Sequence, residues 1–464
     1  MGQRPNHMDP DEFRRQGYKA VDWLADYMAR LDDLPVKTPV EPGDVRAKLA
    51  VSAPKHGEEF SAVLADLDRV IVPGLTHWQA PGFFAYFPAN ASGPATLADL
   101  VSSGLGTQGM MWDTSPAVTE LEQHVLDWLA VELDLPERFR GNGVIQDSAS
   151  SSTLCAVLAA RHRAGGIEAL PTLVAYTSEQ AHSSVIKGLR VAGIPDDRIR
   201  IIATTPEYAM RADHLAYEIV QDRKHGLTPF MVIATVGTTS TTAIDPVGEL
   251  GWVAANFDAW LHVDAAFAGT ASLCPEMRFL NAGLESADSY VFNPHKWMLT
   301  NLDCSAFFVA DRASLNNALS ITPEYLHNPA SEAGTVVDYR DWQVPLGRRF
   351  RALKLWFVIR HYGVEGLRAH IRRHLAWAAE LTDWVKADDR FELVAPTVVS
   401  LVSFRHAGGD TATRRVLDTV NQSGRAYLTA TTLNGQPTLR VAIGGTRTER
   451  HHVEELWSLI QSAA

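Results

Sequence analysis

The sequence has little of the amino acids that mark several large protein classes. Its 464 residues include three cysteines, Cys155, Cys274 and Cys304, which are too few for a disulfide framework. A reducing, cytoplasmic setting is therefore expected. No run of 18 apolar residues occurs, and the N-terminal MGQRPNHMDPDEF lacks the apolar core of a signal peptide. We expect neither a membrane-spanning helix nor export by a standard signal.

Positive charge is also scarce. Lysine and arginine number 42 against 54 acidic residues, a net charge of −12, and no basic run occurs. Such a chain is a poor candidate for binding nucleic acid or an anionic membrane. The zinc patterns H-E-x-x-H and C-x-x-C are missing, and His451-His452 has no partners at metal spacing, so no metal site is expected. Only nine of the basic residues are lysines, which draws attention to any lysine in an apolar stretch.

The N-terminal region predicts helices that lack a core of their own. Asp9 is placed to cap a helix that has Pro10 in its first turn and an amphipathic pattern through Leu31. A second helical pattern covers residues 58–72, after the proline-rich stretch 35–45. Because both helices lack core partners, we expect residues 1–90 to form a helical segment that packs on another subunit.

The middle of the chain predicts an α/β fold with a mostly parallel sheet. Short apolar runs alternate with helical stretches, as expected of strands buried on both faces. The runs are 172–178, 199–205, 230–236, 260–266 and 289–295. The next run, 305–311, follows too closely for a parallel crossover, so one antiparallel strand is expected. We predict a large domain over 91–353 and a smaller α+β domain over 354–464 with a strand at 439–445.

Four segments with reactive side chains lie where predicted strands end or helices begin, which is where open α/β sheets bind ligands. Asp264 ends an apolar strand, either as a cap or as a carboxylate facing a cation. Lys296 lies just past another strand, either at the surface or as a Schiff-base lysine. The stretch 147–153 (DSASSST) begins a helix, and its hydroxyls either cap that helix or bind a phosphate group. His182 follows a strand and is either structural or stacks on a ring.

The four signals are individually weak but together match one cofactor. Pyridoxal phosphate (PLP) has an aldehyde for a lysine, a ring nitrogen for an acid, a phosphate for a helix N-terminus and a flat face for a histidine. The sequence therefore indicates a PLP site.

Long stretches of the sequence carry a resemblance to a known family. They are HWQAPGFFAYFPA (77–89), SPAVTELE (115–122), SEQAHSSV (179–186), HVDAAFAGTASLCPEMRFL (from 262), ADSYVFNPHKWMLTNLDCSAFFV (from 287) and DYRDWQVPLGRRFRALKLWFV (338–358). The chain resembles the PLP-dependent group II decarboxylases, most closely their aromatic L-amino acid decarboxylase branch, over about residues 9–460. The resemblance implies PLP fold type I, like aspartate aminotransferase. It also implies a homodimer with a shared active site.

The resemblance also implies roles for individual residues. Lys296 would bond to the cofactor, Asp264 would pair with its ring nitrogen and His182 would stack on the ring. The remaining cofactor contacts would be Ser148, Ala149, Ser150 and Asn293 at the phosphate, Ala266 on the other ring face, Thr239 near the ring and His295 beside the lysine.

A catalytic acid is expected in the segment TPEYLHNPASEAGTVVDYRDW (322–342), which is similar to the family's mobile catalytic loop. Tyr325 matches the family's tyrosine, which marks decarboxylases, whereas relatives with phenylalanine there tend to be aldehyde synthases. The resemblance implies that Tyr325 helps protonate the carbon that loses CO₂.

The substrate side is implied by a further set of residues. Those that match the family's aromatic pocket are Trp78, Tyr86, Phe87 and Pro88; Gly347 matches a position where glycine accompanies roomier pockets. Four positions depart from the family pattern. Asp147 stands where glycine is frequent and Ala89 where threonine is, while Gln108 and Met110 replace apolar or aromatic residues that the partner subunit contributes to the pocket.

The expected function is PLP-dependent decarboxylation of an aromatic L-amino acid to its amine and CO₂. Three alternatives stay open: an aromatic aldehyde synthase on the same scaffold, a PLP-binding protein without turnover, and a decarboxylase of an acidic amino acid. The product separates the first from the leading hypothesis. The second would require a chemically essential residue to be missing, and the aromatic pocket disfavours the third.

Overall fold

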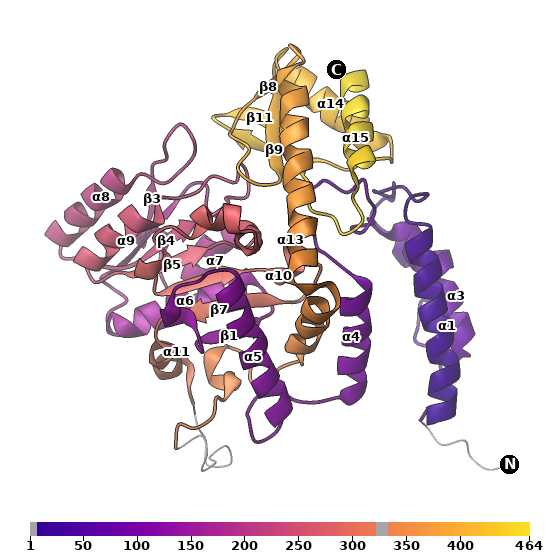
Figure 1. The fold of residues 1–464 in the computed structure, drawn as a ribbon, viewed down its shortest axis with the longest axis horizontal. Coiled ribbons are helices and arrows are strands. Elements are labelled where there is room, and N and C mark those ends of the chain that lie inside the picture. The colour runs from indigo at the N-terminus through magenta and orange to yellow at the C-terminus, as the bar shows by residue number, and fades with distance from the viewer. Residues whose placement is uncertain (1–6, 322–332) are drawn as a thin grey trace.

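The computed structural model describes residues 7–321 and 333–464 of the chain. Its centre is a seven-stranded sheet with the order β1-β7-β6-β5-β4-β2-β3 (Figure 1). The strands are β1 (Gly143–Gln146), β2 (Leu173–Ser178), β3 (Ile199–Ile202), β4 (Thr228–Thr235), β5 (Trp260–Asp264), β6 (Ser289–Phe292) and β7 (Ser305–Val309). Adjacent strands pair in parallel, except that β7 runs antiparallel to both β6 and β1. The predicted single antiparallel strand is confirmed, whereas β1 escaped prediction because four residues carry almost no periodic signal.

Helices cover both faces of this sheet, as the alternation of side chains along the strands requires. One face packs against α5 (Pro116–Glu132), α8 (Ala212–Lys224), α9 (Val247–Asn256) and the first half of α13 (Arg351–Lys386). The other packs against α6 (Ala149–Arg163), α7 (Ser183–Val191) and α11 (Arg312–Leu319). On β2, for example, Val174 and Tyr176 face the first layer and Leu173 and Ala175 the second.

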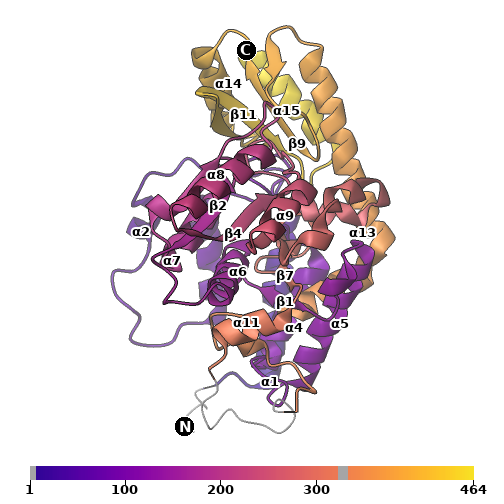
Figure 2. The same ribbon diagram turned by 90° about the vertical axis from the view of Figure 1, so that its left-hand side faces the viewer.

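A smaller α+β unit follows along α13, which rises out of the large sheet's helical layer (Figures 1 and 2). Its antiparallel sheet has the order β10-β11-β9-β8, from β8 (Phe391–Leu393), β9 (Leu401–His406), β10 (Thr429–Leu433) and β11 (Gln436–Ala442). The helices α14 (Asp410–Gln422) and α15 (Arg450–Ala463) and the end of α13 share one core with it. A left-handed Gly363 (φ 66°) interrupts α13 between its two halves.

The N-terminal helices α1 and α3 stand apart from both sheets (Figure 1). The helices of this region are α1 (Pro10–Ala29), α2 (Asp44–Lys48) and α3 (Phe60–Asp66), followed later by α4 (Gly93–Leu105), which packs on α13. The predicted cap is present, because the Glu12 amide donates to Asp9 Oδ1 at 2.7 Å. In α1 only Gln16 is buried and Phe13 is 58% exposed, so much of the apolar side of this helix is uncovered within the described chain.

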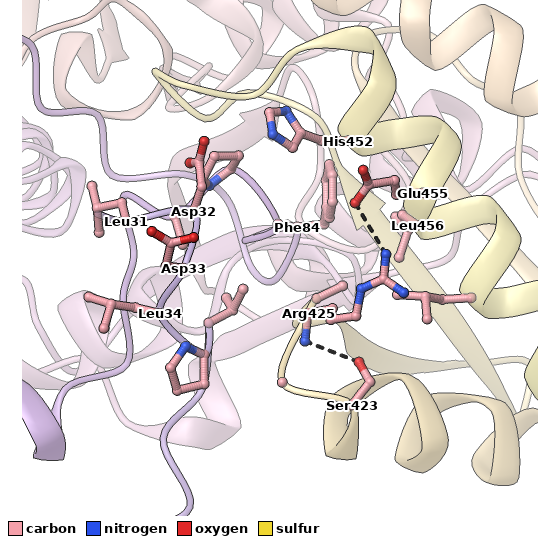
Figure 3. Close-up of a pocket in the computed structure, with 18 of the residues that line it drawn as sticks. Leu31, Asp32, Asp33, Leu34, Phe84, Ser423, Arg425, His452, Glu455 and Leu456 are labelled. Carbon is pink, nitrogen blue, oxygen red and sulfur yellow. Dashed lines mark hydrogen bonds and ion pairs between the residues drawn. The ribbon is translucent and has the colours of Figure 1, made fainter. Parts of the chain in front are cut away.

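The end of α1 and the segment that follows it are hydrogen-bonded to the small unit. The Val36 amide donates to the Gly424 carbonyl at 2.8 Å, and Arg447 donates to the Met28 carbonyl at 2.7 Å. A cavity of about 520 Å³ lies between this segment and α15, with Asp32 and Asp33 on one side and the Arg425–Glu455 ion pair on the other (Figure 3).

Candidate active site

A cavity of about 220 Å³ lies at the carboxyl ends of the parallel strands of the large sheet. All ten residues predicted to contact the cofactor line it: Ser148, Ala149, Ser150, His182, Thr239, Asp264, Ala266, Asn293, His295 and Lys296. They are joined by Phe87, which was predicted on the substrate side, and by Ser184, Thr235, Gly237 and Phe267. The topology thus brings together side chains that are up to 209 residues apart in the chain, as the strand-end argument predicts.

Asp264 is the last residue of β5 and is 4% exposed. Its Oδ1 accepts a hydrogen bond from the Ala266 amide at 3.0 Å, which fixes the carboxylate at the carboxyl end of the strand. Two residues earlier on the same strand, His262 contacts Thr153 of α6 at 3.2 Å and Ser289 of β6 at 2.8 Å. Burial lowers the pKa of His262 to about 4, so this neutral ring ties the strand of Asp264 to the helix that borders the cavity.

The N-terminus of α6 forms the second wall. Ser148 is its N-cap and accepts a hydrogen bond from the Ser151 amide at 3.3 Å, while its own hydroxyl donates to Asp147 at 3.1 Å. The helix therefore points free amide groups, hydroxyls and its positive dipole end at the cavity. The exposed Asp147 places a negative charge at the edge of that same region.

Lys296 lies on α10 (Pro294–Trp297), a single turn directly after β6. Burial lowers the pKa of its amine, and the positive charge of Arg440 lowers it further, while Asp264 opposes the shift. Two hydrogen bonds hold the turn ahead of the lysine. His295 Nδ1 accepts from the Cys304 amide at 2.9 Å, and Ser305 of β7 donates to Asn293 at 2.7 Å. Cys304 directly precedes β7 and Ser305 is its first residue, so one short segment supplies both of these anchors.

His182 is the N-cap of α7, which places it at the end of β2 as the sequence predicts. Its Nδ1 lies 2.7 Å from the Ser184 hydroxyl and accepts from the Ser184 amide at 3.2 Å. Desolvation at the cavity wall and the nearby charge of Lys296 lower the pKa of His182. The contacts with Ser184 fix the ring through Nδ1, and among residues 7–321 and 333–464 its Nε2 makes no hydrogen bond.

Arg440 is a residue that the sequence did not single out. It lies on β11 of the small sheet, is 4% exposed and donates to the Thr239 carbonyl at 2.5 Å and the Tyr86 carbonyl at 3.3 Å. Its guanidinium carbon is 5.4 Å from the Phe87 ring centre, and Lys296 Nζ is 5.3 Å from the same ring. Burial lowers the pKa of Arg440 to about 10, which still leaves a positive charge beside the lysine at neutral pH. No local pattern in LRVAIGG distinguishes this arginine from an ordinary strand residue.

The predicted substrate-side residues fall into separate places. Phe87 lines the cavity, whereas Trp78 and Tyr86 are 40% and 48% exposed and stack on each other with ring centres 5.6 Å apart. Pro88 is buried outside the lining. The side-chain oxygen of Gln108 accepts a hydrogen bond of 2.6 Å from the Arg348 amide, the residue after Gly347. Gln108, Gly347 and Met110 all lie outside the cavity lining. Tyr325 lies outside the described residues.

The cavity offers a set of groups that fits PLP. It presents one amine with a lowered pKa, one nearly buried carboxylate and a helix N-terminus rich in hydroxyls. The hydroxyl of Thr235 is buried at the cavity and has no hydrogen-bond partner among residues 7–321 and 333–464. A buried polar atom of this kind calls for a polar ligand, so the lining matches a cofactor with polar edges and an anionic group.

Comparison with known proteins settles the family. The Pyridoxal-dependent decarboxylase conserved domain matches residues 42–407. The chain belongs to the pyridoxal-dependent decarboxylase family. It is a PLP-using carboxy-lyase, as the resemblance implied.

The decarboxylase is similar along almost its whole length to proteins of known name. It is 46% identical to phenylacetaldehyde synthase of Arabidopsis thaliana, over 98% of this chain and 96% of that protein. It is 43% identical to tryptophan decarboxylase 2 of Oryza sativa subsp. japonica, over 98% and 95%. The crystal structure of Oryza sativa TDC with PLP and tryptamine superposes with a TM-score of 0.96 at 42% identity, covering 100% of this chain and 99% of that one. The predicted fold type is thereby confirmed.

The structure also bears on the expectations about membrane-spanning helices and cysteines. Within the described residues of the decarboxylase, no helix combines the length and apolar character needed to cross a bilayer. The three cysteines are unpaired and buried.

Proposed function

We propose that the protein converts an aromatic L-amino acid of the tryptophan, 5-hydroxytryptophan, DOPA, tyrosine or phenylalanine class to its amine and CO₂. The observation that carries the proposal is the cavity in which Lys296, Asp264 and His182 meet beside the ring of Phe87. Relatives named tryptophan decarboxylase and tyrosine decarboxylase, at 43% and 44% identity, support the aromatic class.

The site residues are proposed to divide the chemistry as follows. Bound PLP supplies the electron sink for the electron pair left when the carboxylate departs as CO₂. Lys296 uses its amine, whose pKa is lowered by burial, to hold the cofactor and later to release the product. Asp264 keeps a proton on the ring nitrogen, so that charge developing in the transition state is stabilised. His182 covers one face of the ring and Ala266 the other, which keeps the reacting bond oriented and excludes water.

The phosphate is proposed to bind at the N-terminus of α6, with Ser148, Ala149, Ser150 and Asn293 around it, while Thr239 and His295 border the ring and the lysine. The carboxylate of Asp147 then opposes the bound dianion. Replacement of Asp147 by asparagine keeps an acceptor for the Ser148 hydroxyl and removes the charge. We expect the Kd for PLP to fall by about 3- to 10-fold, as for removal of one screened charge.

The PLP affinity is read from the visible absorbance of apo-protein titrated with PLP. Asp389→Asn, which removes a charge from an exposed turn of the small unit, serves as the control. An unchanged or weaker affinity in the Asp147 variant would place the phosphate elsewhere.

An aldehyde synthase is the second candidate, because phenylacetaldehyde synthase is among the similar proteins. Tyr325 argues for the decarboxylase. Its hydroxyl is proposed to deliver the proton to the carbon that loses CO₂, and without it the electron-rich carbon is left to react with O₂. We expect Tyr325→Phe to shift the product from amine to aldehyde, ammonia and peroxide, measured together in one incubation. An unchanged amine yield in this variant would remove Tyr325 from the mechanism.

The protein is proposed to work as a homodimer in the cytoplasm. Apolar side chains on α1 and α4 are exposed, among them Phe13, Tyr18, Leu97 and Leu105. Their burial against a second copy would explain helices without a core, and would bring the partner's Gln108 and Met110 to the cavity. The division into residues 1–90, 91–353 and 354–464 is part of this proposal, and the three unpaired cysteines support a reducing compartment.

Product analysis tests the proposal directly. PLP-loaded protein is incubated with L-tryptophan, 5-hydroxytryptophan, L-tyrosine, L-DOPA, L-phenylalanine, L-histidine and L-glutamate, and amine, aldehyde and peroxide are assayed together. Amine from the aromatic substrates without peroxide is the expected result. Aldehyde with equal peroxide would establish the synthase instead. A yellow, lysine-bonded protein without any product would indicate binding without turnover.

A further inference from the structure

A buried series of rings runs from the cavity wall to α13. Phe87 at the cavity stacks on Phe267 with ring centres 3.9 Å apart, and Phe267 stacks on Trp297 at 4.8 Å. The indole Nε1 of Trp297 donates a hydrogen bond of 2.8 Å to Nδ1 of His374, whose ring lies within 6° of the indole plane. Trp297 and His374 are both fully buried. The residue that follows Lys296 is thus bonded to a helix that continues into the small unit.

The hydrogen bond to Trp297 is the contact that requires a polar side chain at position 374. Because Nδ1 accepts from the indole, the ring carries its proton on Nε2, and that atom has no partner within the described parts of the chain. Burial lowers the pKa of His374 well below its usual value, so the ring stays neutral. A buried polar atom without a partner is destabilising, and an apolar side chain would fill the space without that loss. The bond to Trp297 is the one contact that an apolar residue could not replace.

The turn that carries Lys296 depends on its neighbours for its position. The helix α10 has four residues, and its N-cap Asn293 makes no capping bond with its side chain. His295 anchors the turn ahead of the lysine through Cys304, and Trp297 anchors it behind. Without the bond to His374, the indole of Trp297 would be oriented by packing alone, chiefly its stacking on Phe267.

We infer that His374 is a positioning residue for Lys296, acting through its hydrogen bond with the indole of Trp297. The inference rests on the proposed role of Lys296. The helix α13 holds the Trp297 ring in one orientation, and that orientation fixes where the Lys296 amine points into the cavity. His374 touches neither substrate nor cofactor.

Two substitutions of equal size separate the hydrogen bond from packing. Asparagine at position 374 retains an acceptor near the place of Nδ1, whereas leucine has the same branched shape and no acceptor. We expect His374→Leu to lower kcat by about 10-fold, the size expected for one lost hydrogen bond, with little change in KM. It should also move the pH midpoint of the holoenzyme's visible absorbance band by about half a unit, since the lysine amine is repositioned. His374→Asn should stay within about 3-fold of the parent in kcat and keep its midpoint.

Further variants distinguish a positioning role of His374 from a merely structural one. Trp297→Phe removes the donor and should reproduce the His374→Leu midpoint, and the double variant should add nothing further. His370→Phe, one turn earlier on α13 and in ring contact with His374 at 4.3 Å, is the packing control and should leave the midpoint unchanged. Equal effects of leucine and asparagine, or the same shift in His370→Phe, would overturn the inference. Failure of the proposed function would show differently, as an unaltered absorbance band in Lys296→Ala.

Discussion

Replacement of Lys296 by alanine is expected to abolish the visible absorbance band of the PLP-loaded protein and to lower kcat by on the order of 10³-fold. The amine is the one nucleophile proposed to bond to the cofactor, and no hydroxyl of the lining has a comparable reactivity toward an aldehyde. Lys187→Ala, on the exposed side of α7, keeps both band and rate if the effect is specific. A yellow, active Lys296→Ala protein would refute the assignment.

The same lysine gives a pH dependence whose sign follows from its surroundings. Burial and Arg440 lower the pKa of Lys296, so the amine loses its proton at a lower pH than an ordinary lysine does. The rate at which apo-protein captures PLP should therefore rise with pH through a midpoint below 10.5, the usual lysine value. Stopped-flow absorbance at a series of pH values measures it. A midpoint at or above 10.5 would mean that the amine is solvated before the cofactor arrives.

Asp264→Asn is expected to lower kcat by about 10²- to 10³-fold, because an amide cannot keep the ring nitrogen protonated as a carboxylate does. The asparagine oxygen can still accept from the Ala266 amide, so the end of β5 should keep its shape. The loss should therefore appear in kcat more than in the melting temperature.

A second buried acid provides the contrast. Asp222 is 4% exposed and pairs with Arg200 on the far side of the sheet, away from the cavity. Asp222→Asn should lower the melting temperature and leave kcat within about 2-fold of the parent, since Asp222 bonds only to structural groups, Arg200 and the Tyr176 hydroxyl, within the described residues. If Asp264→Asn behaved like Asp222→Asn, the carboxylate would be structural and the proposed proton on the ring nitrogen would lose its support.

Much of the cavity was predictable because its residues follow apolar runs directly. Asp264, Lys296 and His182 each come at or just after the end of a strand, and parallel strands deliver their carboxyl ends to one edge of a sheet. The antiparallel β7 was predictable from the short connection before it. These features depend on local pattern and chain geometry, both of which the sequence displays.

The rest of the site arises where the small unit packs against the large sheet, and no local pattern encodes that contact. Arg440 is one polar residue in an apolar strand, and His374 is one of several histidines on a long helix. Each is recognised only by what it touches, namely the Thr239 carbonyl and the Trp297 indole. The positions of Trp78, Tyr86 and Gln108 relative to a substrate were likewise not fixed by motif, since all three lie outside the cavity lining.

The order of the chain has a consequence for how the protein is made. Among the described residues, all those that line the cavity come before residue 297, and β7, which completes the sheet, ends at Val309. During synthesis from the N-terminus, the cofactor contacts proposed above therefore leave the ribosome while about the last third of the chain is still to be translated. The two groups that hold this set from outside, His374 and Arg440, arrive last. A nascent chain thus contains the residues proposed to bind PLP before it contains His374 and Arg440, which hold those residues in position.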